Sequence, residues 1–434
     1  MIWAKEEKLS RDEIEQIQLE RLKKQVEYAY NRVKPYREKM DKLSVKPSDI
    51  NSLEDLKYLP FVVKSDFREN YPFGMFAVDR KELKRLHASS GTTGKPTVVG
   101  YTQNDMDMWT ETVSRIAAMG GATKDDTAQI CFGYGMFTGA LGLHYGLENI
   151  GADIIPSSAG NTEKQVMFMR DFGTTVLVAT PSYALHIAEV IQEQGMNPAR
   201  DFSLKYGILG GESLSDKMRY ELNEIWEGKV LFTQNYGMSE LNGPGVSGEC
   251  DKLQGMHICE DHFLAEVINP ETEEVLKPGE EGELVITCLT KETLPLIRYR
   301  TGDLTSLHYE PCSCGRTTVR MEALKGRSDD MLLIRGVNVF PSQIEEVLLS
   351  IDEVGSNYEI IVERIRHMDK MTVVVELTEY DLLSSYSYIE ELEKQIRSRI
   401  KGITGVDSKV KIAAPRTLKR FEGKAKRVID LRKS

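Results

Sequence analysis

From residue 83 to about residue 240 the chain alternates short apolar or β-branched runs with longer stretches of mixed polarity. The runs have the length of strands, and the stretches between them have the length of helices. The expected strands are 127–132, 152–156, 175–179, 206–209 and 230–232, and the clearest expected helices are 182–194 and 215–226. This alternation is typical of βαβ units with parallel strands, so it predicts an α/β domain.

The pattern changes beyond residue 262. Two strand-like segments, 263–269 and 282–289, flank a turn region with two prolines, which indicates an antiparallel β subdomain appended to the α/β core. Beyond residue 328 the expected elements are strand 331–334, helix 341–350, strands 359–364 and 371–377, helix 388–400 and strand 409–412. This β-α-β-β-α-β order is that of a small ferredoxin-like α+β domain.

We therefore expect a large N-terminal domain, 1–327, with its β subdomain at about 245–325, and a small C-terminal domain, 328–434. At the start of the chain, Ser10 and Glu13 have the spacing of a capping box, and apolar residues follow at roughly helical intervals. These residues predict an amphipathic helix over 10–33 that docks on the core, with a partner-binding helix as the alternative.

The charge balance limits the class of ligand. The 434 residues include 56 Lys and Arg against 67 Asp and Glu, which gives a net charge of −11. Nucleic-acid binding relies on a clustered basic surface, so we expect no nucleic-acid partner, whereas a small anion needs only a local positive site. No apolar run reaches the roughly 18 to 20 residues of a membrane span, and residues 1–8 lack the apolar core of a signal peptide. We expect a cytoplasmic protein with no membrane partner.

The sharpest local motif is a loop of small hydroxyl residues and glycines. It consists of Ser89, Ser90, Gly91, Thr92, Thr93, Gly94, Lys95 and Pro96. Its N–H and O–H groups can converge on phosphate oxygens, and its lysine adds positive charge. It is not a Walker A loop, because Pro96 and a strand-like segment follow the lysine where Ser or Thr and a helix would stand. A plain surface turn is the alternative.

Polar residues also follow the last expected strand of the core, at the carboxyl end where open α/β sheets bind ligands. Here Tyr236 can stack on a base, Ser239 can donate to a phosphate, and Glu240 can hold Mg²⁺. Further along, Asp303 can accept hydrogen bonds from both hydroxyls of a ribose. Taken alone, the segment after the strand is a weak signal, and an exposed loop is its alternative. For the segment of Asp303 taken alone, a structural Arg/Asp network is the favoured interpretation.

Two basic positions lie outside these segments. Arg327 is at the expected end of the first domain, and Lys424 follows Gly423 in the charged segment 421–428. A run of charges is usually a solvated surface, and by itself this segment would be interpreted in that way.

The six cysteines are too few for a disulfide framework in a chain of this length. A Cys-x-Cys turn can direct two thiolates to one point, and a cysteine and a histidine lie upstream in the expected β subdomain. The candidate ligands are Cys250, His257, Cys312 and Cys314. Three sulfurs and one nitrogen form a tetrahedral set suited to structural Zn²⁺. The alternatives are reduced cysteines without metal, or Cys259 in place of His257. Cys131 and Cys288 are expected in the core.

Together, and in this order, these segments resemble the acyl-adenylate-forming enzymes, which include acyl-CoA synthetases, luciferases and nonribosomal peptide adenylation domains. The resemblance runs from the loop at Ser89 to Lys424 and covers nearly the whole chain. Five segments look like the phenylacetate-CoA ligases rather than the long-chain or acetyl enzymes. They are 88–102, 260–263, 289–292, 294–304 and 335–341.

The resemblance implies a reaction in two steps. A carboxylate first displaces diphosphate from ATP to give an acyl-adenylate, and the thiol of CoA then displaces AMP without a nucleophile from the protein. It also implies that the small domain is mobile, turns at Asp329 between the steps, and carries the catalytic residue Lys424. The implied ligands are an aryl acid, ATP, CoA and Mg²⁺ on Glu240, with the zinc site as a structural addition. We expect a homodimer.

The same resemblance implies the remaining site residues. ATP and AMP would be bound by Ser89, Ser90, Gly91, Thr92, Thr93, Gly94, Lys95, Gly211, Glu212, Ser213, Asn235, Tyr236, Gly237, Met238, Ser239, Asp303 and Arg327. CoA would be bound by Arg335, Gly336, Val337 and Asn338. The acid pocket would be formed by Tyr134, Gly135, Phe137 and Ala140. Glycines and aromatic rings can enclose a flat ring, although a strand-to-helix turn with buried aromatics is an equal alternative.

The implied function is therefore that of an AMP-forming acid–thiol ligase acting on phenylacetate. One alternative keeps this chemistry on another aryl acid, such as indoleacetate, a hydroxyphenylacetate or benzoate. The other is a nucleotide-binding relative without catalytic activity, which would have no reason to keep Lys424 together with Asp303, Arg327 and Glu240.

Overall fold

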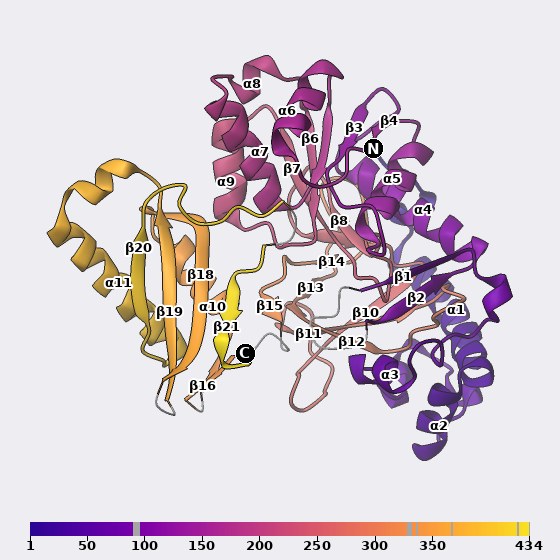
Figure 1. Ribbon diagram of the computed structural model, residues 1–434. Helices are drawn as coiled ribbons and strands as arrows, with labels where there is room; N and C mark the ends of the chain where they lie inside the picture. The colour runs from indigo at the N-terminus through magenta and orange to yellow at the C-terminus, as the bar shows by residue number, and fades with distance from the viewer. Residues whose placement is uncertain (90–95, 328–331, 336, 366–367, 423–424, 434) are drawn as a thin grey trace.

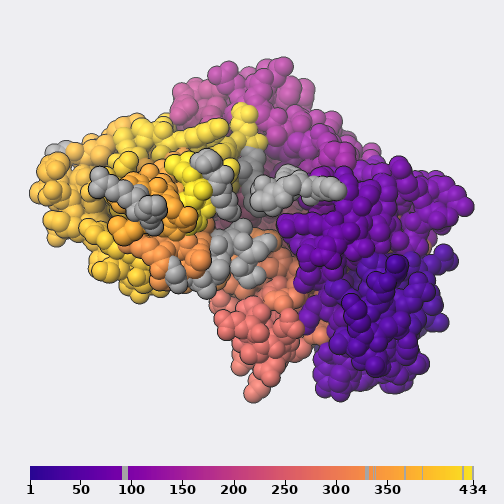
Figure 2. All heavy atoms as spheres, turned by 60° about the horizontal axis from the view of Figure 1, so that its bottom comes forward, coloured from indigo at the N-terminus to yellow at the C-terminus, as the bar shows by residue number. Residues whose placement is uncertain are grey.

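A computed structural model describes residues 1–89, 96–327, 332–335, 337–365, 368–422 and 425–433. In Figure 1 the chain from α10 to the C-terminus forms a lobe beside the rest. Figure 2 shows the orange and yellow atoms of this lobe next to the indigo and magenta body. We call residues 332–433 the small lobe and residues 1–327 the large lobe. The boundary expected near residue 328 and the hinge expected at Asp329 lie outside the described residues.

The large lobe is built on a nine-stranded mixed sheet with the strand order β13-β14-β9-β8-β7-β6-β5-β3-β4. Its parallel part contains β3 (Thr127–Ile130), β4 (Asp153–Ile155), β5 (Val176–Ala179), β6 (Tyr206–Gly210) and β7 (Leu231–Tyr236). One group of helices contains α4 (Gln103–Met119) and α5 (Gly139–Asn149), and the other, across the sheet, contains α6 (Thr162–Asp171), α7 (Pro181–Glu193) and α9 (Asp216–Ile225) (Figure 1). Every residue of β5 is buried, as expected for a strand covered on both faces. The α/β core predicted from the alternation is confirmed.

The antiparallel strands expected after residue 262 are present, but the strands between 245 and 327 belong to two sheets. Extending the large sheet are β8 (Ser247–Glu249), β9 (Met256–Ile258), β13 (Leu307–His308) and β14 (Arg320–Met321). A separate four-stranded sheet contains, in spatial order, β10 (Phe263–Ile268), β11 (Gly282–Cys288), β12 (Tyr299–Thr305) and β15 (Gly326–Arg327). The strands divide between two sheets because β8 turns back and pairs antiparallel with β7, which extends the large sheet.

The helix expected over 10–33 is α1 (Arg11–Arg32). Its capping box is formed, since the Ser10 hydroxyl accepts from the Glu13 N–H and the Glu13 carboxylate accepts from the Ser10 N–H at 2.8 Å. The other short elements are α2 (Lys34–Lys42), α3 (Lys64–Glu69), β1 (Arg85–Ala88), β2 (Val98–Tyr101), α8 (Pro198–Asp201) and the 3₁₀ helices at Lys5–Lys8, Pro47–Asp49, Leu53–Tyr58, Arg80–Glu82, Tyr380–Ser384 and Leu431–Lys433.

The inner face of α1 docks on the large lobe near the start of β10. Arg11 forms an ion pair with Glu260 at 2.8 Å, and Gln18 donates to the Glu260 carbonyl at 3.0 Å. The apolar side chains of this face, Ile14, Leu22, Val26 and Ala29, are buried. The amphipathic pattern of α1 is therefore accounted for by docking on its own chain.

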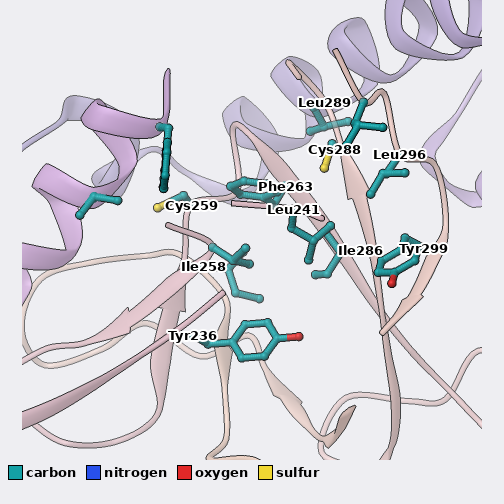
Figure 3. Packing of buried hydrophobic residues seen from close by; sticks show 14 of the residues in the cluster. Tyr236, Leu241, Ile258, Cys259, Phe263, Ile286, Cys288, Leu289, Leu296 and Tyr299 are labelled. Atoms are coloured by element: carbon teal, nitrogen blue, oxygen red, sulfur yellow. The ribbon is translucent and has the colours of Figure 1, made fainter. Parts of the chain in front are cut away.

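An apolar core fills the space between the large sheet and the four-stranded sheet. Figure 3 shows part of this core, in which side chains of β9, β10, β11 and β12 lie close together. Cys259 and Cys288 are among them, and each exposes at most 2% of its surface. Cys131 is buried in a second cluster, which it shares with side chains of α6, α7 and α9.

The small lobe has its own apolar core. Its sheet has the order β20-β19-β18-β21. The elements are β16 (Leu332–Ile334), β17 (Val337–Val339), α10 (Pro341–Leu349), β18 (Val354–Ile365), β19 (Met368–Leu377), α11 (Tyr386–Thr404), β20 (Lys409–Ala413) and β21 (Val428–Asp430). The expected α+β content is confirmed, with one difference of topology. The first expected strand pairs with β17 in a tight hairpin, because only two residues separate them, and β21 takes the fourth place in the sheet, parallel to β18.

Among the residues that the structure describes, no helix is both long and apolar enough to cross a bilayer.

Candidate active site

A buried polar cluster forms where β7, β12 and β15 meet. The Tyr236 hydroxyl donates to Asp303 Oδ2 at 2.6 Å, and Arg327 Nη1 donates to Asp303 Oδ1 at 2.7 Å. Asp303 exposes only 3% of its surface, whereas the Arg327 side chain exposes 24%. The residues expected to bind ribose and adenine thus lie together, although they come from three distant parts of the sequence.

The strand arrangement explains this meeting. Asp303 and Arg327 are directly opposite each other on antiparallel neighbours, and Tyr236 is the last residue of β7. Burial raises the pKa of Tyr236, and the charge of Asp303 raises it further, so the hydroxyl stays protonated and serves as a donor. The cluster therefore fixes a carboxylate at the carboxyl edge of the parallel strands, where such sheets bind ligands.

The loop expected to bind phosphate closes the hairpin of β1 and β2. At its base the Ser89 N–H donates to the Thr97 carbonyl at 2.9 Å, and the Ser89 hydroxyl accepts from the Thr97 N–H at 3.2 Å. The Ala88 N–H donates to the Met136 carbonyl at 3.0 Å, so the base of the loop lies against the segment expected to bind the acid. The expected residues Ser90, Gly91, Thr92, Thr93, Gly94 and Lys95 lie outside the described part of the chain.

The loop after β7 carries Ser239 and Glu240 into buried surroundings. The Ser239 hydroxyl lies 3.3 Å from the Thr138 hydroxyl, so the segments expected to bind phosphate and the acid also meet here. Gly237 cannot be replaced without a shift, because a Cβ there would lie 2.2 Å from the Asn242 carbonyl oxygen. The carboxylate of Glu240 is of the oxygen-donor type that Mg²⁺ prefers.

Sequence reasoning missed Lys291, whose side chain binds the main chain of this loop. The Lys291 side chain is fully buried, and its ammonium donates to the carbonyls of Glu240, at 3.1 Å, and of Leu241. The ammonium also lies 4.7 Å from the centre of the Tyr101 ring. Burial lowers the pKa of Lys291. The available signal in the sequence was the position of Lys291 shortly after β11, a strand whose residues are all buried. The partners of Lys291 could be identified only from the fold.

The turn after β6 contacts both lobes. The Glu212 carboxylate accepts from the Ser182 hydroxyl at 2.7 Å and from the N–H of Ala425. Ala425 is the residue that follows Lys424 in the sequence, and Lys424 itself lies outside the described residues. The segment expected to enclose adenine thus lies next to the loop expected to carry the catalytic lysine.

Other contacts fix the main chain around Glu212. Gly211 has φ = +78°, a conformation that favours glycine, and the Ser213 hydroxyl donates to the Leu324 carbonyl at 3.3 Å. On the neighbouring strand, the Asn235 amide donates to the Leu209 carbonyl at 2.8 Å. These three expected site residues therefore have structural anchors of their own.

The segment expected to bind the acid is only partly enclosed. The Tyr134 hydroxyl lies 3.0 Å from His144 Nδ1, and burial raises the pKa of Tyr134. Ala140 is buried, but Phe137 exposes 46% of its surface, and the space around a Cβ at Gly135 is open. His144, which sequence reasoning did not include, is the partner that fixes Tyr134.

The segment expected to bind CoA forms the turn between β16 and β17. Arg335 is exposed, has φ = +53°, and donates from Nε to the Asp369 carbonyl at 2.8 Å. Val337 exposes 37% of its surface. Gly336 and the Asn338 side chain lie outside what the structure describes. Because Asp369 belongs to β19, this contact stays within the small lobe.

The four expected metal ligands converge at the edge of the large sheet. The ligand atoms of Cys250, His257, Cys312 and Cys314 all lie within 4.8 Å of one another. The Cys250 and Cys312 sulfurs are 3.8 Å apart, and Cys314 Sγ is 3.6 Å from His257 Nε2. A tetrahedral zinc ion with Zn–S of about 2.3 Å and Zn–N of about 2.0 to 2.1 Å requires separations of about 3.8 and 3.6 Å. The residues present therefore fit zinc, and Cys259 lies in the apolar core instead (Figure 3).

The surroundings of the cluster also suit a metal. His257 Nδ1 lies 3.0 Å from the Thr318 hydroxyl, which orients Nε2 toward Cys314. Burial and the nearby arginine charges lower the pKa of His257 to about 3, so the imidazole is neutral. Arg316 donates to Cys314 Sγ at 3.6 Å and forms a buried ion pair with Glu7. Its positive charge is thus shared between the Glu7 carboxylate and the Cys314 sulfur.

A cavity of about 370 Å³ lies elsewhere in the large lobe, between α1, β10 and the segment 275–278. None of the expected site residues lines it. The candidate active site is thus defined by its polar groups and not by this cavity.

Two family models match the chain. The AMP-binding enzyme model matches residues 39–288, and the AMP-binding enzyme C-terminal domain model matches residues 336–432. The first covers the parallel sheet and the start of the four-stranded sheet, and the second covers most of the small lobe.

The chain is also similar to curated proteins over nearly its whole length. It is 47% identical to the phenylacetate-coenzyme A ligase of Thermus thermophilus, over 98% of each chain. It is 45% identical to the phenylacetate-coenzyme A ligase of Escherichia coli, over 98% of this chain and 97% of that one.

Among solved structures, 2-hydroxyisobutyryl-CoA ligase in the postadenylation state, in complex with 2-HIB-AMP, gives a TM-score of 0.89 at 29% identity and covers 99% of this chain and 92% of that one. The same ligase in the thioesterification state, in complex with 2-HIB-AMP and CoA, gives a TM-score of 0.72 at 30% identity with the same coverage. The lobes are therefore arranged more as in the postadenylation state. The chain belongs to the AMP-binding enzyme family, and its expected likeness to the phenylacetate-coenzyme A ligases of that family is confirmed.

Proposed function

We propose that this chain is an ATP-dependent, AMP-forming ligase that activates phenylacetate as an acyl-adenylate and transfers the acyl group to CoA. The products are phenylacetyl-CoA, AMP and diphosphate. The observation that carries the proposal is the meeting of the Asp303 cluster and the segment beside Lys424 at one edge of the sheet. The near full-length likeness to phenylacetate-coenzyme A ligases supports the choice of acid.

In the first step, a carboxylate oxygen of the acid attacks the α-phosphorus of ATP, and diphosphate leaves. Both reactants are anions, so positive charge and oriented donors are needed where charge accumulates. Lys424 supplies that charge between the carboxylate and the α-phosphate. Loop 89–95 and Ser239 bind phosphate oxygens, and Mg²⁺, when bound at Glu240, neutralises phosphate charge.

The nucleoside is held by the residues around the Asp303 cluster. Asp303 accepts hydrogen bonds from the ribose hydroxyls, while Tyr236 and Arg327 hold the carboxylate in place. The main chain at 211–213 and at 235–238 encloses the adenine. A fixed carboxylate distinguishes ribose by two hydroxyls at once, which favours a nucleotide over other phosphate esters.

In the second step the small lobe turns at Asp329 and presents the turn at Arg335–Asn338 to CoA. The sulfur of CoA attacks the acyl carbon, the bond from that carbon to the AMP oxygen breaks, and the thiol proton passes to solvent. AMP is a good leaving group, so no nucleophile from the protein is required. The acid lies against Tyr134, Gly135, Phe137 and Ala140, with the Tyr134 hydroxyl held by His144.

A screen of acids tests the proposed function. Diphosphate release is measured with aryl, arylacetic and short fatty acids, each with and without CoA. We expect the highest kcat/KM with phenylacetate, about one diphosphate per active site without CoA, and continuous turnover with CoA. A higher kcat/KM for indoleacetate or benzoate would reassign the acid. ATP binding without diphosphate release from any acid would indicate a non-catalytic protein.

We also propose that Cys250, His257, Cys312 and Cys314 hold a structural Zn²⁺. The fit of the sulfur and nitrogen separations to tetrahedral zinc supports this, as does the neutral, oriented His257. None of the four ligands belongs to the Asp303 cluster, so the metal stabilises the edge of the large sheet and takes no part in the chemistry.

Protein purified without added zinc should contain about one zinc ion per chain, measured by atomic emission. Cys312→Ser should lose this zinc and lower the melting temperature by roughly 5 to 10 °C, because metal-binding free energy contributes to folding. Cys259→Ala is the matched control and should keep the zinc. Only trace zinc in the unaltered protein would contradict the site, and zinc loss in Cys259→Ala would make Cys259 a ligand.

The expected homodimer and the expected cytoplasmic location stay predictions. Light scattering of the purified protein checks the first, and fractionation of the source cells checks the second.

A further inference from the structure

Residues 416–422 of the small lobe, which lead toward the expected catalytic lysine, are fastened to α7 of the large lobe. We call them the docking segment. Arg420 forms a bidentate ion pair with Glu189, with both N–O distances at 3.0 Å. Arg416 pairs with Glu193 at 2.9 Å. Residues four apart share one face of a helix, so the two pairs fix the register of the docking segment along α7.

Contacts also lie on both sides of Lys424 in the sequence. The Glu422 carboxylate accepts from the Thr162 hydroxyl at 3.3 Å, and the Ala425 N–H donates to Glu212. The described neighbours of Lys424 are thus attached to the large lobe at the edge where the Asp303 cluster lies.

Among these contacts, the ion pair of Arg420 has the most hydrogen bonds and is partly buried. Its guanidinium also binds Glu376 of β19 at 2.8 and 3.0 Å, so it is shared between one carboxylate of each lobe. The side chains of Arg420 and Glu189 expose only 15% and 23%. A bidentate, partly buried pair stabilises more than an exposed one. Burial raises the pKa of Glu189, but its interactions with His186 and Arg420 lower it overall, so this carboxylate is ionised at neutral pH.

The neighbouring helix α9 provides a second attachment. The ammonium of Lys217 donates to the carbonyl of Ile351, at 2.9 Å, and to that of Val354. Ile351 lies just beyond α10 and Val354 is the first residue of β18, so Lys217 binds the main chain of the turn that joins these two elements. The small lobe is therefore docked through α7 and α9, which lie side by side (Figure 1).

We propose that Glu189 and Glu193 are positioning residues for acyl-adenylate formation. Their ion pairs hold the docking segment so that Lys424 serves the first step, and the pairs break before the lobe turns for the second step. This inference rests on the proposed two-step function. Neither glutamate belongs to the polar clusters of the candidate site. They bias the equilibrium between two lobe arrangements by the free energy of the pairs.

Glu189→Gln should slow acyl-adenylate formation roughly three- to tenfold in single-turnover diphosphate release, as expected when a partly exposed ion pair is lost. Thioester formation from supplied phenylacetyl-adenylate and CoA should be unchanged or faster. Raising the NaCl concentration should slow the first step of the unaltered protein more than that of the variant, because salt screens the pair.

A charge exchange gives a second test at the more exposed pair. Glu193→Arg should slow the first step by like-charge repulsion with Arg416, and adding Arg416→Glu should restore it. A purely structural defect would not recover in the double variant.

Asp407→Asn is the matched control, since it breaks a bidentate pair with Arg397 that lies wholly within the small lobe. It should leave the ratio of the two step rates unchanged. Equal slowing of both steps by Glu189→Gln would overturn the inference.

Hydrogen exchange of residues 416–422 in the ligand-free protein gives an answer independent of catalysis. Exchange should be faster in Glu189→Gln than in the unaltered protein and Asp407→Asn, and unchanged exchange would overturn the inference. If no acid supports diphosphate release, the proposed function fails while this exchange measurement still decides whether the docking exists.

Discussion

Lys424→Ala should slow acyl-adenylate formation by at least about a hundredfold while leaving ATP affinity nearly unchanged. Removal of one oriented positive group from a site of developing negative charge typically costs 10²- to 10³-fold in rate. The described contact of Ala425 with Glu212 brings the chain on the C-terminal side of Lys424 to the expected nucleotide site. Single-turnover diphosphate release with phenylacetate measures the effect.

The second half-reaction is the internal control for this variant. Thioester formation from supplied phenylacetyl-adenylate should be largely intact, because the lysine serves only the first step. Lys426→Ala is the matched variant, since it removes an exposed lysine two residues away. A comparable loss in both half-reactions, or in both variants, would contradict the role given to Lys424.

Asp303→Asn should weaken ATP binding by about a hundredfold and raise the KM for ATP far more than it lowers kcat. The amide keeps the shape of the carboxylate but loses the charge that Arg327 and the Tyr236 hydroxyl bind. It also accepts hydrogen bonds at one oxygen only, so it cannot hold both ribose hydroxyls and both protein donors. Titration calorimetry with ATP and the steady-state KM measure the effect.

Loss of stability alone must be separated from this effect, because breaking a buried ion pair destabilises a fold by several kcal/mol, roughly 3 to 5. Glu283→Gln is the control, since Glu283 is as buried as Asp303 and pairs with Arg300 in the same sheet at 2.6 Å. Both variants should melt at lower temperature, but only Asp303→Asn should lose ATP affinity. Equal loss of affinity would show that Asp303 acts through the fold rather than on the nucleotide.

Local patterns predicted much of the fold because they report burial directly. The run that became β5 is apolar throughout and lies inside the sheet, and the capping box at Ser10 begins α1 at the expected residue. The pairing of strands that are distant in sequence produces no local pattern of this kind. The pairing of β8 with β7, and the place of β21 beside β18, depend on contacts that no local periodicity encodes.

The same division holds for the site. The Cys-x-Cys turn predicted the Cys/His cluster, because two of its members, Cys312 and Cys314, lie only two positions apart in the sequence. The support that Lys291 gives to the Glu240 loop could not be predicted, since 50 residues separate them and the contact is to a carbonyl, which every residue has. Glu189 and Glu193 were likewise indistinguishable from ordinary helix surface until the docking segment was found against them.

The docking of α1 near Glu260 has a consequence for how the chain is made. Gln18 and its partner are 242 residues apart. At a synthesis rate of about 5 to 20 residues per second, the helix leaves the ribosome on the order of 10 to 50 s before Glu260 does. During that interval α1 can pack against α2 and the segments 47–49 and 53–58, which follow it closely in the sequence, but not against the region of Glu260. The part of its inner face that docks near β10 therefore stays exposed until the middle of the protein has emerged.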